Sequence, residues 1–147
     1  MSQLNKVQKA YFAGFLDGDG SIYVQLKPNA TYRYGFQIAP YIVLYQSQKS
    51  RKSFEKLCSM LGLGYMRERR DGILEYIIGR NDEIRTFLAL VQPYVLLKKN
   101  QVELMLQILA AKERVKNSED FQALAKLVDR FRELNYSKKR KKRIVTP

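Results

Sequence analysis

The chain has 147 residues, and its 27 Lys and Arg outnumber 14 Asp and Glu, so the formal net charge at pH 7 is +13. This length suits one folded domain with a core, and the charge favours a polyanionic partner, either a nucleic acid or an acidic membrane surface. The absence of histidine excludes histidine-dependent bases, triads and metal sites, and the single cysteine, Cys58, excludes an internal disulfide.

The first half of the chain predicts a helix followed by two strands. The helix is expected over about residues 6–16, and a half-buried strand over residues 21–27, where apolar residues alternate with polar ones. After a turn, a second strand is expected at about residues 32–45, where Pro40 indicates a bulge or an edge position. The residues of this second strand expected to face outward are Gln37, Ala39, Tyr41, Val43 and Tyr45.

The second half predicts one more pair of strands and several helices. A helix starts near Ser50 and ends at a Gly62 cap, and the Asp71-Gly72 turn predicts a hairpin between strands at residues 65–69 and 73–79. Three further helices are expected, one capped by Asn81, one over about residues 99–114 and one capped by Ser118. The order predicts an α+β domain with an antiparallel sheet backed by helices.

Residues 11–20, Y-F-A-G-F-L-D-G-D-G, form the most informative motif of the chain. A carboxylate at the carboxyl end of a helix suits a divalent cation, because the helix dipole is negative there. Ala10, Ala13 and Gly14 are small enough to let a second helix approach closely. The alternative for the D-G-D-G run is a tight turn, since Gly accepts positive φ and Asp bonds to its own backbone.

The run F-A-G-F-L-D-G-D-G, residues 12–20, resembles the signature of the LAGLIDADG homing endonucleases. The resemblance continues in S-I-Y-V-Q-L-K-P-N, in Gln46, in V-Q-P-Y-V-L-L-K-K-N-Q and in L-N-Y-S-K, in the order of the single-motif branch, and covers about residues 8–139. It implies an αββαββα core with a curved sheet on DNA, expected as one domain over residues 1–137. The basic run that follows is expected to form a tail at residues 138–147. The resemblance also implies a homodimer formed through the motif helices. The expected interface residues are Ala10, Tyr11, Ala13, Gly14 and Asp17.

The resemblance further implies a site-specific, metal-dependent endonuclease. It would make double-strand breaks in a long pseudo-palindromic DNA site, leave 5′ phosphate and 3′ hydroxyl ends, and so initiate intron homing. Mg²⁺ is the expected ion, Mn²⁺ is expected to substitute for it, and Ca²⁺ is expected to bind without supporting cleavage.

The resemblance assigns catalytic roles to a few residues. Asp19 and the carbonyl of Gly18 are implied metal ligands, Gln46 is implied to position water, and Lys98 to support water activation. Without the resemblance, Gln46 would be taken as a strand end and Lys98 as the start of a solvated helix. Asp17 is expected to be structural, tying down the helix end. Ser50 stands where relatives often carry a basic residue, and the candidates to replace it are Lys49 and Arg51.

A polar row on the strands is the expected DNA-reading surface, because a strand ribbon fits the major groove and presents alternate side chains to base edges. The alternative is an ordinary solvated sheet face. The expected base contacts are Ser21, Tyr23, Gln25, Lys27, Asn29, Tyr32, Arg33, Gln37 and Tyr41 on the first two strands and Tyr65, Arg67, Arg69 and Glu75 on the hairpin. The expected phosphate contacts are Lys116, Ser137, Lys138 and Lys139; the basic run at residues 138–143 could instead be a nuclear localisation signal or a nonspecific nucleic-acid tail.

The alternative to the nuclease is an intron RNA maturase or a non-cleaving DNA-binding protein of the same fold. A basic ribosome-associated protein is favoured by charge alone. No apolar stretch is long enough to span a membrane and the N-terminus has no signal-peptide core, so neither a membrane partner nor secretion is expected. The resemblance implies an intron-borne origin in an organelle or a microbe, and the expected location is an organelle, a chloroplast in preference to a mitochondrion.

Overall fold

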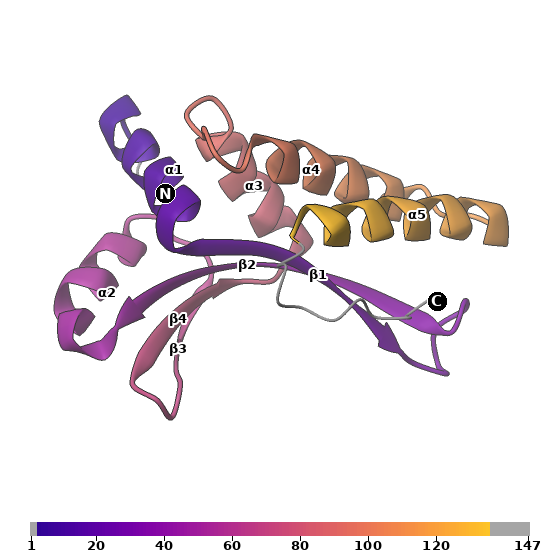
Figure 1. The fold of residues 1–147 in the computed structure, drawn as a ribbon, viewed down its shortest axis with the longest axis horizontal. Helices are drawn as coiled ribbons and strands as arrows, with labels where there is room; N and C mark the ends of the chain where they lie inside the picture. Colours follow the sequence, from indigo (N-terminus) through magenta and orange to yellow (C-terminus); the bar gives the residue numbers. More distant parts are fainter. Residues whose placement is uncertain (1–2, 136–147) are drawn as a thin grey trace. The chain divides into compact units, whose positions relative to one another are not determined.

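The computed structural model describes residues 3–135, which form six helical segments and four strands in the predicted order (Figure 1). The αββαββα core predicted from the sequence is therefore confirmed, and two further helices follow it. The elements are α1 (Lys6–Asp19), β1 (Gly20–Pro28), β2 (Phe36–Ser47), the short 3₁₀ helix η1 (Gln48–Ser50), α2 (Arg51–Ser59), β3 (Tyr65–Glu68), β4 (Ile73–Ile78), α3 (Asn81–Val91), α4 (Lys99–Glu113) and α5 (Ser118–Leu134).

The four strands form one sheet in the order β1-β2-β4-β3. Strand β4 runs antiparallel to both β2 and β3, and Leu74 lies opposite Gln46 on one side and Glu68 on the other. The predicted hairpin turn is also confirmed: Gly72 has a φ of 81°, and the Arg69 amide donates to the Ile73 carbonyl at 2.8 Å. Glycine at position 72 is favoured because side-chain-bearing residues rarely adopt that conformation.

Strand β2 corrects part of the sequence analysis. It lies between β1 and β4, so the edge position considered for Pro40 is wrong. Two residues expected to face outward, Ala39 and Val43, are 7% and 1% exposed. An inner strand has neighbours on both sides, and its small apolar side chains are therefore covered even on the face that was expected to be solvated.

The described residues group into two compact units. The first contains residues 3–22 and 41–99; in it α1 packs on α3, and the rings of Phe12 and Phe87 meet edge-to-face at 6.3 Å. The second contains residues 23–40 and 100–135, in which α4 and α5 lie side by side (Figure 1) and bury residues such as Met105 and Phe131. The division at residue 137 between a domain and a basic tail stays a prediction.

Helix α1 is longer than predicted and includes the D-G-D run. It begins with a capping box, in which the Asn5 side chain accepts from the Gln8 amide at 2.8 Å and the Gln8 side chain accepts from the Asn5 amide at 2.9 Å. It continues to Asp19, and Gly20 is already extended, with φ −115° and ψ 167°. The tight-turn alternative for this run is therefore wrong.

Three helix caps differ from those predicted, and the first is Gly62, because α2 already ends at Ser59 with Met60 in the cap position. Asn81 and Ser118 are the first helical residues of α3 and α5, and the residues before them occupy the cap positions. Arg80 provides no side-chain cap, whereas the Asn117 side chain accepts from the Asp120 amide at 2.8 Å. Adjacent polar residues make such caps ambiguous by one position in sequence. Within residues 3–135, none of the helices is long and apolar enough for a membrane span.

Candidate metal centre and nucleic-acid surface

The last turn of α1 exposes oxygen atoms that could bind a metal ion. Asp19 is the final helical residue and is exposed, as is Gly18 before it. Carbonyl groups in the last turn of a helix lack partners within the helix, and the dipole places partial negative charge there. A carboxylate and backbone carbonyls at this position match the hard oxygen ligands that Mg²⁺ prefers.

Asp17 has a different role from Asp19, because both oxygens of its carboxylate accept hydrogen bonds from backbone amides of the same chain. It accepts hydrogen bonds from the amides of Leu96 at 2.8 Å, Leu97 at 3.0 Å and Lys98 at 3.0 Å. These bonds tie the segment before α4 to the end of α1. The predicted structural role of Asp17 is confirmed, while its place in a protein interface stays a prediction.

Lys98 joins the same cluster. Its Nζ donates to the backbone carbonyl of Asp17 at 2.9 Å, and the side chain is half-buried. The ammonium group is thus held at the helix end, two residues from Asp19. Lys98 is therefore not merely the start of a solvated helix, as its sequence position alone would suggest.

Gln46 lies near the end of β2 and makes a local contact. It is half-buried, and its Oε1 accepts from the Ser47 amide at 2.9 Å. The described contacts thus bring Asp17, Lys98 and the end of α1 together, whereas the described bond of Gln46 stays within its own strand. The predicted role of Gln46 in positioning water stays a prediction.

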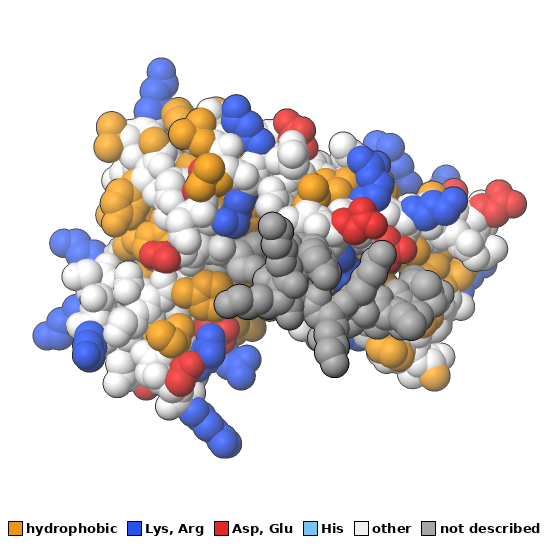
Figure 2. All heavy atoms as spheres, viewed as in Figure 1, with side chains coloured by type: hydrophobic (Ala, Val, Ile, Leu, Met, Phe, Trp, Pro, Cys, Tyr) orange, Lys and Arg blue, Asp and Glu red, His pale blue; other side chains and the backbone are white. Residues whose placement is uncertain are grey.

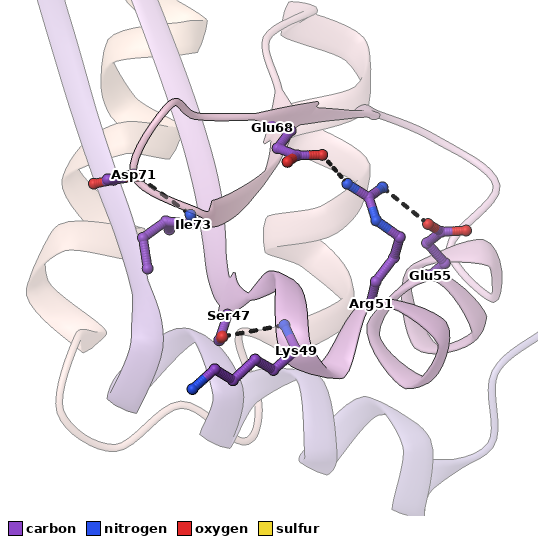
Figure 3. A network of polar contacts seen from close by, with 7 residues as sticks. All are labelled: Ser47, Lys49, Arg51, Glu55, Glu68, Asp71 and Ile73. Carbon is purple, nitrogen blue, oxygen red and sulfur yellow. Dashed lines mark hydrogen bonds and ion pairs between the residues drawn. The ribbon is translucent and has the colours of Figure 1, made fainter.

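The two candidates to replace a basic residue at Ser50 differ in their surroundings. The Arg51 guanidinium pairs with Glu55 at 3.1 Å and with Glu68 (Figure 3). The Lys49 side chain extends away from this pair in Figure 3, and its amide donates to the Ser47 hydroxyl at 3.2 Å. Arg51 is thus occupied by two carboxylates, which leaves Lys49 as the better candidate.

The expected interface residues on α1 fall into two groups. Ala10, Tyr11 and Gly14 are exposed, Tyr11 by 58%, and a Cβ built at Gly14 meets nothing within 4 Å. Ala13 is fully buried inside its own chain, so its prediction as an interface residue is wrong. The helical period explains this, because residues 12, 13 and 16 share the face that packs on the core.

Three exposed apolar residues beside this helix face or on it were not predicted from the sequence. Val7 is 78% exposed, Leu96 75% and Leu97 77%. The two leucines lie in the segment before α4, and their backbone amides donate to the Asp17 carboxylate. An apolar pair outside any predicted helix or strand, in V-L-L-K-K, was the available signal.

The expected DNA-reading residues show the alternation of a half-buried strand. On β1, Ile22 and Val24 are buried, whereas Gln25 and Lys27 are exposed. The remaining expected contacts on β1, β2 and their loop are exposed or half-exposed, namely Ser21, Tyr23, Asn29, Tyr32, Arg33, Gln37 and Tyr41. Lys116 is exposed too, while Ser137, Lys138 and Lys139 lie outside the described residues.

The β3–β4 hairpin carries the second set of expected contacts. Tyr65 is 57% exposed and Arg67 and Arg69 are exposed, but each arginine is near an acid: Arg67 lies 3.9 Å from Glu75 and Arg69 2.7 Å from Asp71. In Figure 2, Lys and Arg side chains gather at the left and lower left, where Figure 1 places α2 and this hairpin. Asp and Glu side chains lie among them, so this part of the surface carries charges of both signs.

The chemistry of the donor set limits what one chain can bind. Across residues 3–135, no group of three or more His, Cys, Asp and Glu side chains is placed to hold a metal ion. Asp19 fits an ion by its donor type and exposure, but it brings only one carboxylate.

The fold and the end of α1 match a known family. The features that match are the αββαββα core, the exposed Asp19 at the end of the first helix and Lys98, which is bonded to that helix end. The family model described as LAGLIDADG endonuclease matches residues 12–108, and the chain belongs to this family. It is similar to the DNA endonuclease I-CreI of Chlamydomonas reinhardtii, at 36% identity over 141 residues, 95% of this chain and 86% of that protein. It is also similar to the DNA endonuclease I-CvuI of Chlorella vulgaris, at 29% identity over 136 residues, 92% of this chain and 84% of that protein.

Solved structures agree with the fold. The structure of I-CvuI in complex with the I-CreI target, in the presence of 2 mM Mg, matches with a TM-score of 0.84 and 30% identity, over 92% of this chain and 86% of that one. The archaeal homing endonuclease I-Vdi141I in complex with DNA matches with a TM-score of 0.81 at 20% identity, over 93% of this chain and 89% of that one, which supports the fold alone.

Proposed function

We propose that this chain is a homodimeric homing endonuclease that makes metal-dependent double-strand breaks at a long pseudo-palindromic DNA site. The observation that carries the proposal is the exposed Asp19 carboxylate at the end of a helix whose outer face is also open. Family membership gives this geometry its chemistry, since similar proteins are DNA endonucleases.

The dimer follows from what one chain lacks. A break in both strands needs two reaction centres, and each chain has one motif, in which Asp17 is engaged by backbone amides and Asp19 is exposed. The open side of α1 at Gly14, the exposed Tyr11 and the exposed Leu97 provide a surface of small and apolar groups for a second copy. A two-fold dimer presents two equal surfaces to DNA, so the target is partly palindromic and about 20 bp long.

The Asp19 carboxylate and the Gly18 carbonyl would hold Mg²⁺, together with the matching acid of the second copy and the scissile phosphate. When bound, the ion supplies a lowered pKa for its water and stabilisation of the departing 3′ oxygen. The products would carry 5′ phosphate and 3′ hydroxyl ends. Mn²⁺ would substitute, and Ca²⁺ would support binding without cutting.

The chain's own side chains do the rest of the work. The Asp17 carboxylate binds the segment before α4 to the end of α1. The Lys98 ammonium group therefore lies at the end of α1, where it donates to the Asp17 carbonyl. Lys98 there offsets phosphate charge and favours deprotonation of the attacking water. Gln46 orients that water through its amide group, and Lys49 adds positive charge where Ser50 cannot.

The strands read the target. Gln, Asn and Arg side chains on β1, on the loop after it and on the hairpin can pair with adenine and guanine edges in the major groove. Lys116 contacts phosphate and sets register rather than sequence. Two similar proteins come from Chlamydomonas reinhardtii and Chlorella vulgaris. We place this chain in an organellar intron, chloroplast in preference to mitochondrial, whose spread the break initiates.

The experiment is digestion of a randomised duplex library in Mg²⁺ and in Ca²⁺, followed by sequencing of the ends. The proposal expects discrete double-strand ends that share a partly palindromic site in Mg²⁺, and bound but intact duplexes of the same sequence in Ca²⁺. RNA-selective binding without cutting would instead support a maturase. Sequence-selective DNA binding with no cutting in Mg²⁺ or Mn²⁺ would support a non-cleaving binder.

A further inference from the structure

The loop between β1 and β2 carries three of the expected base contacts, Asn29, Tyr32 and Arg33. It is shaped by its own bonds: the Asn29 amide donates to the Gly35 carbonyl at 2.9 Å, and the Asn29 side chain accepts from the Thr31 amide at 3.0 Å. These bonds fix the loop's internal form. They do not fix how the loop is held against the rest of its unit.

Tyr34 supplies that hold, because its ring turns inward. It stacks on Phe121 of α5 with 5.0 Å between ring centroids and 18° between planes. The Arg33 guanidinium lies 5.6 Å from the centroid of the same ring. Loop and helix start lie at the same end of this unit in Figure 1. Offset aromatic pairs and cation–π contacts both stabilise such an arrangement.

Phe121, the second ring of the stack, is held by hydrogen bonds at the start of α5. Phe121 lies in the first turn of α5, and its amide donates to the Asn117 carbonyl at 3.1 Å. The Lys116 amide donates to the Asp120 carboxylate at 3.1 Å in the same turn. One aromatic contact therefore joins a base-reading loop to the corner that carries an expected phosphate contact.

The place of this loop along the strand indicates which base pairs it reads. Strand β1 starts directly after Asp19 and has nine residues before Asn29. At about 3.3 Å per residue, nine residues span about 30 Å, or about nine base pairs at 3.4 Å each. The loop would therefore meet the outer part of each half-site, far from the scissile phosphates.

We infer that Tyr34 and Phe121 are positioning residues for sequence recognition: their stack holds the β1–β2 loop in register with the Lys116 corner and so sets the base preference at the outer positions of each half-site. This inference rests on the proposed function, since it assumes that the sheet reads DNA. It concerns neither the metal nor the cutting step.

The Tyr34 hydroxyl offers a matched control. Its oxygen is buried and has no hydrogen-bond partner within the described part of the chain, so the ring, not the hydroxyl, makes the contact. Tyr34→Phe keeps the ring and should keep the preference. Tyr34→Leu and Phe121→Leu remove the stack while keeping an apolar side chain of moderate size, which favours retention of the fold.

The test uses the full chain and a randomised duplex library. Duplexes bound in Ca²⁺ and ends cut in Mg²⁺ are sequenced for the wild type, the three single variants and the Tyr34→Leu/Phe121→Leu double variant. We expect the leucine variants to lose roughly tenfold in preference at the outer positions only, with central preference unchanged. We expect Tyr34→Phe to match the wild type, and the double variant to lose no more than either leucine variant, because both act through one contact.

The outcomes separate this inference from the proposed function. Unchanged outer preference in the leucine variants, or an equal loss at every position, would overturn the positioning role. A wild type that binds selectively without cutting would overturn the nuclease, yet the bound pool would still decide the positioning role. A wild type with no sequence-selective binding would overturn both.

Discussion

Two acids separated by one residue carry different tasks in this protein. Asp17 accepts from three backbone amides, whereas Asp19 is exposed at the helix end. Asp17→Asn should therefore lower the free energy of unfolding by about 1–3 kcal/mol, because an amide cannot replace a charged acceptor of several bonds. Asp19→Asn should change it by less than about 0.5 kcal/mol, as exposed positions usually do.

Urea unfolding of both variants at one protein concentration measures these differences. Asp19→Asn serves as the matched control for removal of one negative charge from the same helix end. Equal losses in the two variants would contradict the division of roles.

Cys58 gives a second prediction at this scale, about reactivity. The residue is buried, and burial raises the pKa of its thiol from an ordinary 9.0 to about 12. Only the thiolate reacts, so alkylation of the folded protein at pH 8 should be roughly 100- to 1,000-fold slower than that of the unfolded chain. Folding favours the neutral thiol, so the folded state binds the Cys58 proton more tightly than the unfolded state does. The contribution of this proton to the stability of the fold is fully present below pH 9 and is lost as the pH rises towards 12.

Iodoacetamide labelling followed by mass spectrometry, with and without urea, measures the ratio. Rapid labelling of the folded protein at pH 8 would show that the thiol is accessible and would contradict its place in the core.

Residue roles were predictable to different degrees. Asp19 was singled out because it closes the local motif, whereas Lys98 was singled out only through the family resemblance; the catalytic roles of both stay predictions. The pairing of Arg51 with Glu68 could not be predicted, because it joins α2 to a strand 17 residues away, and pairing across such a distance is set by tertiary structure. Ala13 was misplaced for a related reason: smallness alone does not tell which helix face a residue occupies.

At the scale of elements, two glycines of the motif segment have opposite reasons to be glycine. A Cβ at Gly20 would lie 2.8 Å from Leu16 Cα and 2.9 Å from Leu16 O, whereas a Cβ at Gly14 meets nothing within 4 Å. Gly20→Ala should cost about 1–3 kcal/mol of stability, because backbone must shift to relieve the overlap. Gly14→Ala should cost nothing within the chain, since alanine favours helix by up to about 1 kcal/mol.

Thermal or urea unfolding of the two variants in dilute solution, where association contributes least, measures the difference. A Gly20→Ala variant as stable as the wild type would show that the turn from α1 into β1 is looser than described.

The start of α5 provides a further pair of variants. Asn117 caps the Asp120 amide, whereas Ser118 is already helical. Asn117→Ala should therefore lower stability by about 1 kcal/mol, while Ser118→Ala should be close to neutral. The reverse order in urea unfolding would restore Ser118 as the cap.

The elements themselves were largely predictable, and their ends were not. Hydrophobic period predicted every strand and helix of the core, and Asp71-Gly72 predicted the hairpin. The end of α1 was placed too early because Gly18 is a poor helix former, yet tertiary packing carries the helix on to Asp19. The outward face assigned to β2 failed at Ala39 and Val43 because strand order within a sheet cannot be read from one strand's pattern.

At the scale of the whole molecule, the proposed cutting of both DNA strands requires two chains. Leu97 is 77% exposed on the surface proposed to pair, and Leu134 of α5 is 42% exposed outside it. Leu97→Glu would place a charge in the dimer interface, at a cost of about 3 kcal/mol or more and thus a roughly 100-fold weaker association. Leu134→Glu should leave association unchanged.

Light scattering and sedimentation over a range of concentrations measure the association of both variants. A wild type that stays monomeric while it cuts both DNA strands would contradict the pairing, and so would a Leu97→Glu protein that dimerises as the wild type does.

The most direct test compares the wild type with Asp19→Asn on one duplex selected from the library, in Mg²⁺ and in Ca²⁺. The variant should bind this duplex within about threefold of the wild type. Its double-strand cutting in Mg²⁺ should fall by at least about 1,000-fold, which corresponds to about 4 kcal/mol of transition-state stabilisation. Cutting by Asp19→Asn at the wild-type rate would show that the end of α1 does not hold the metal.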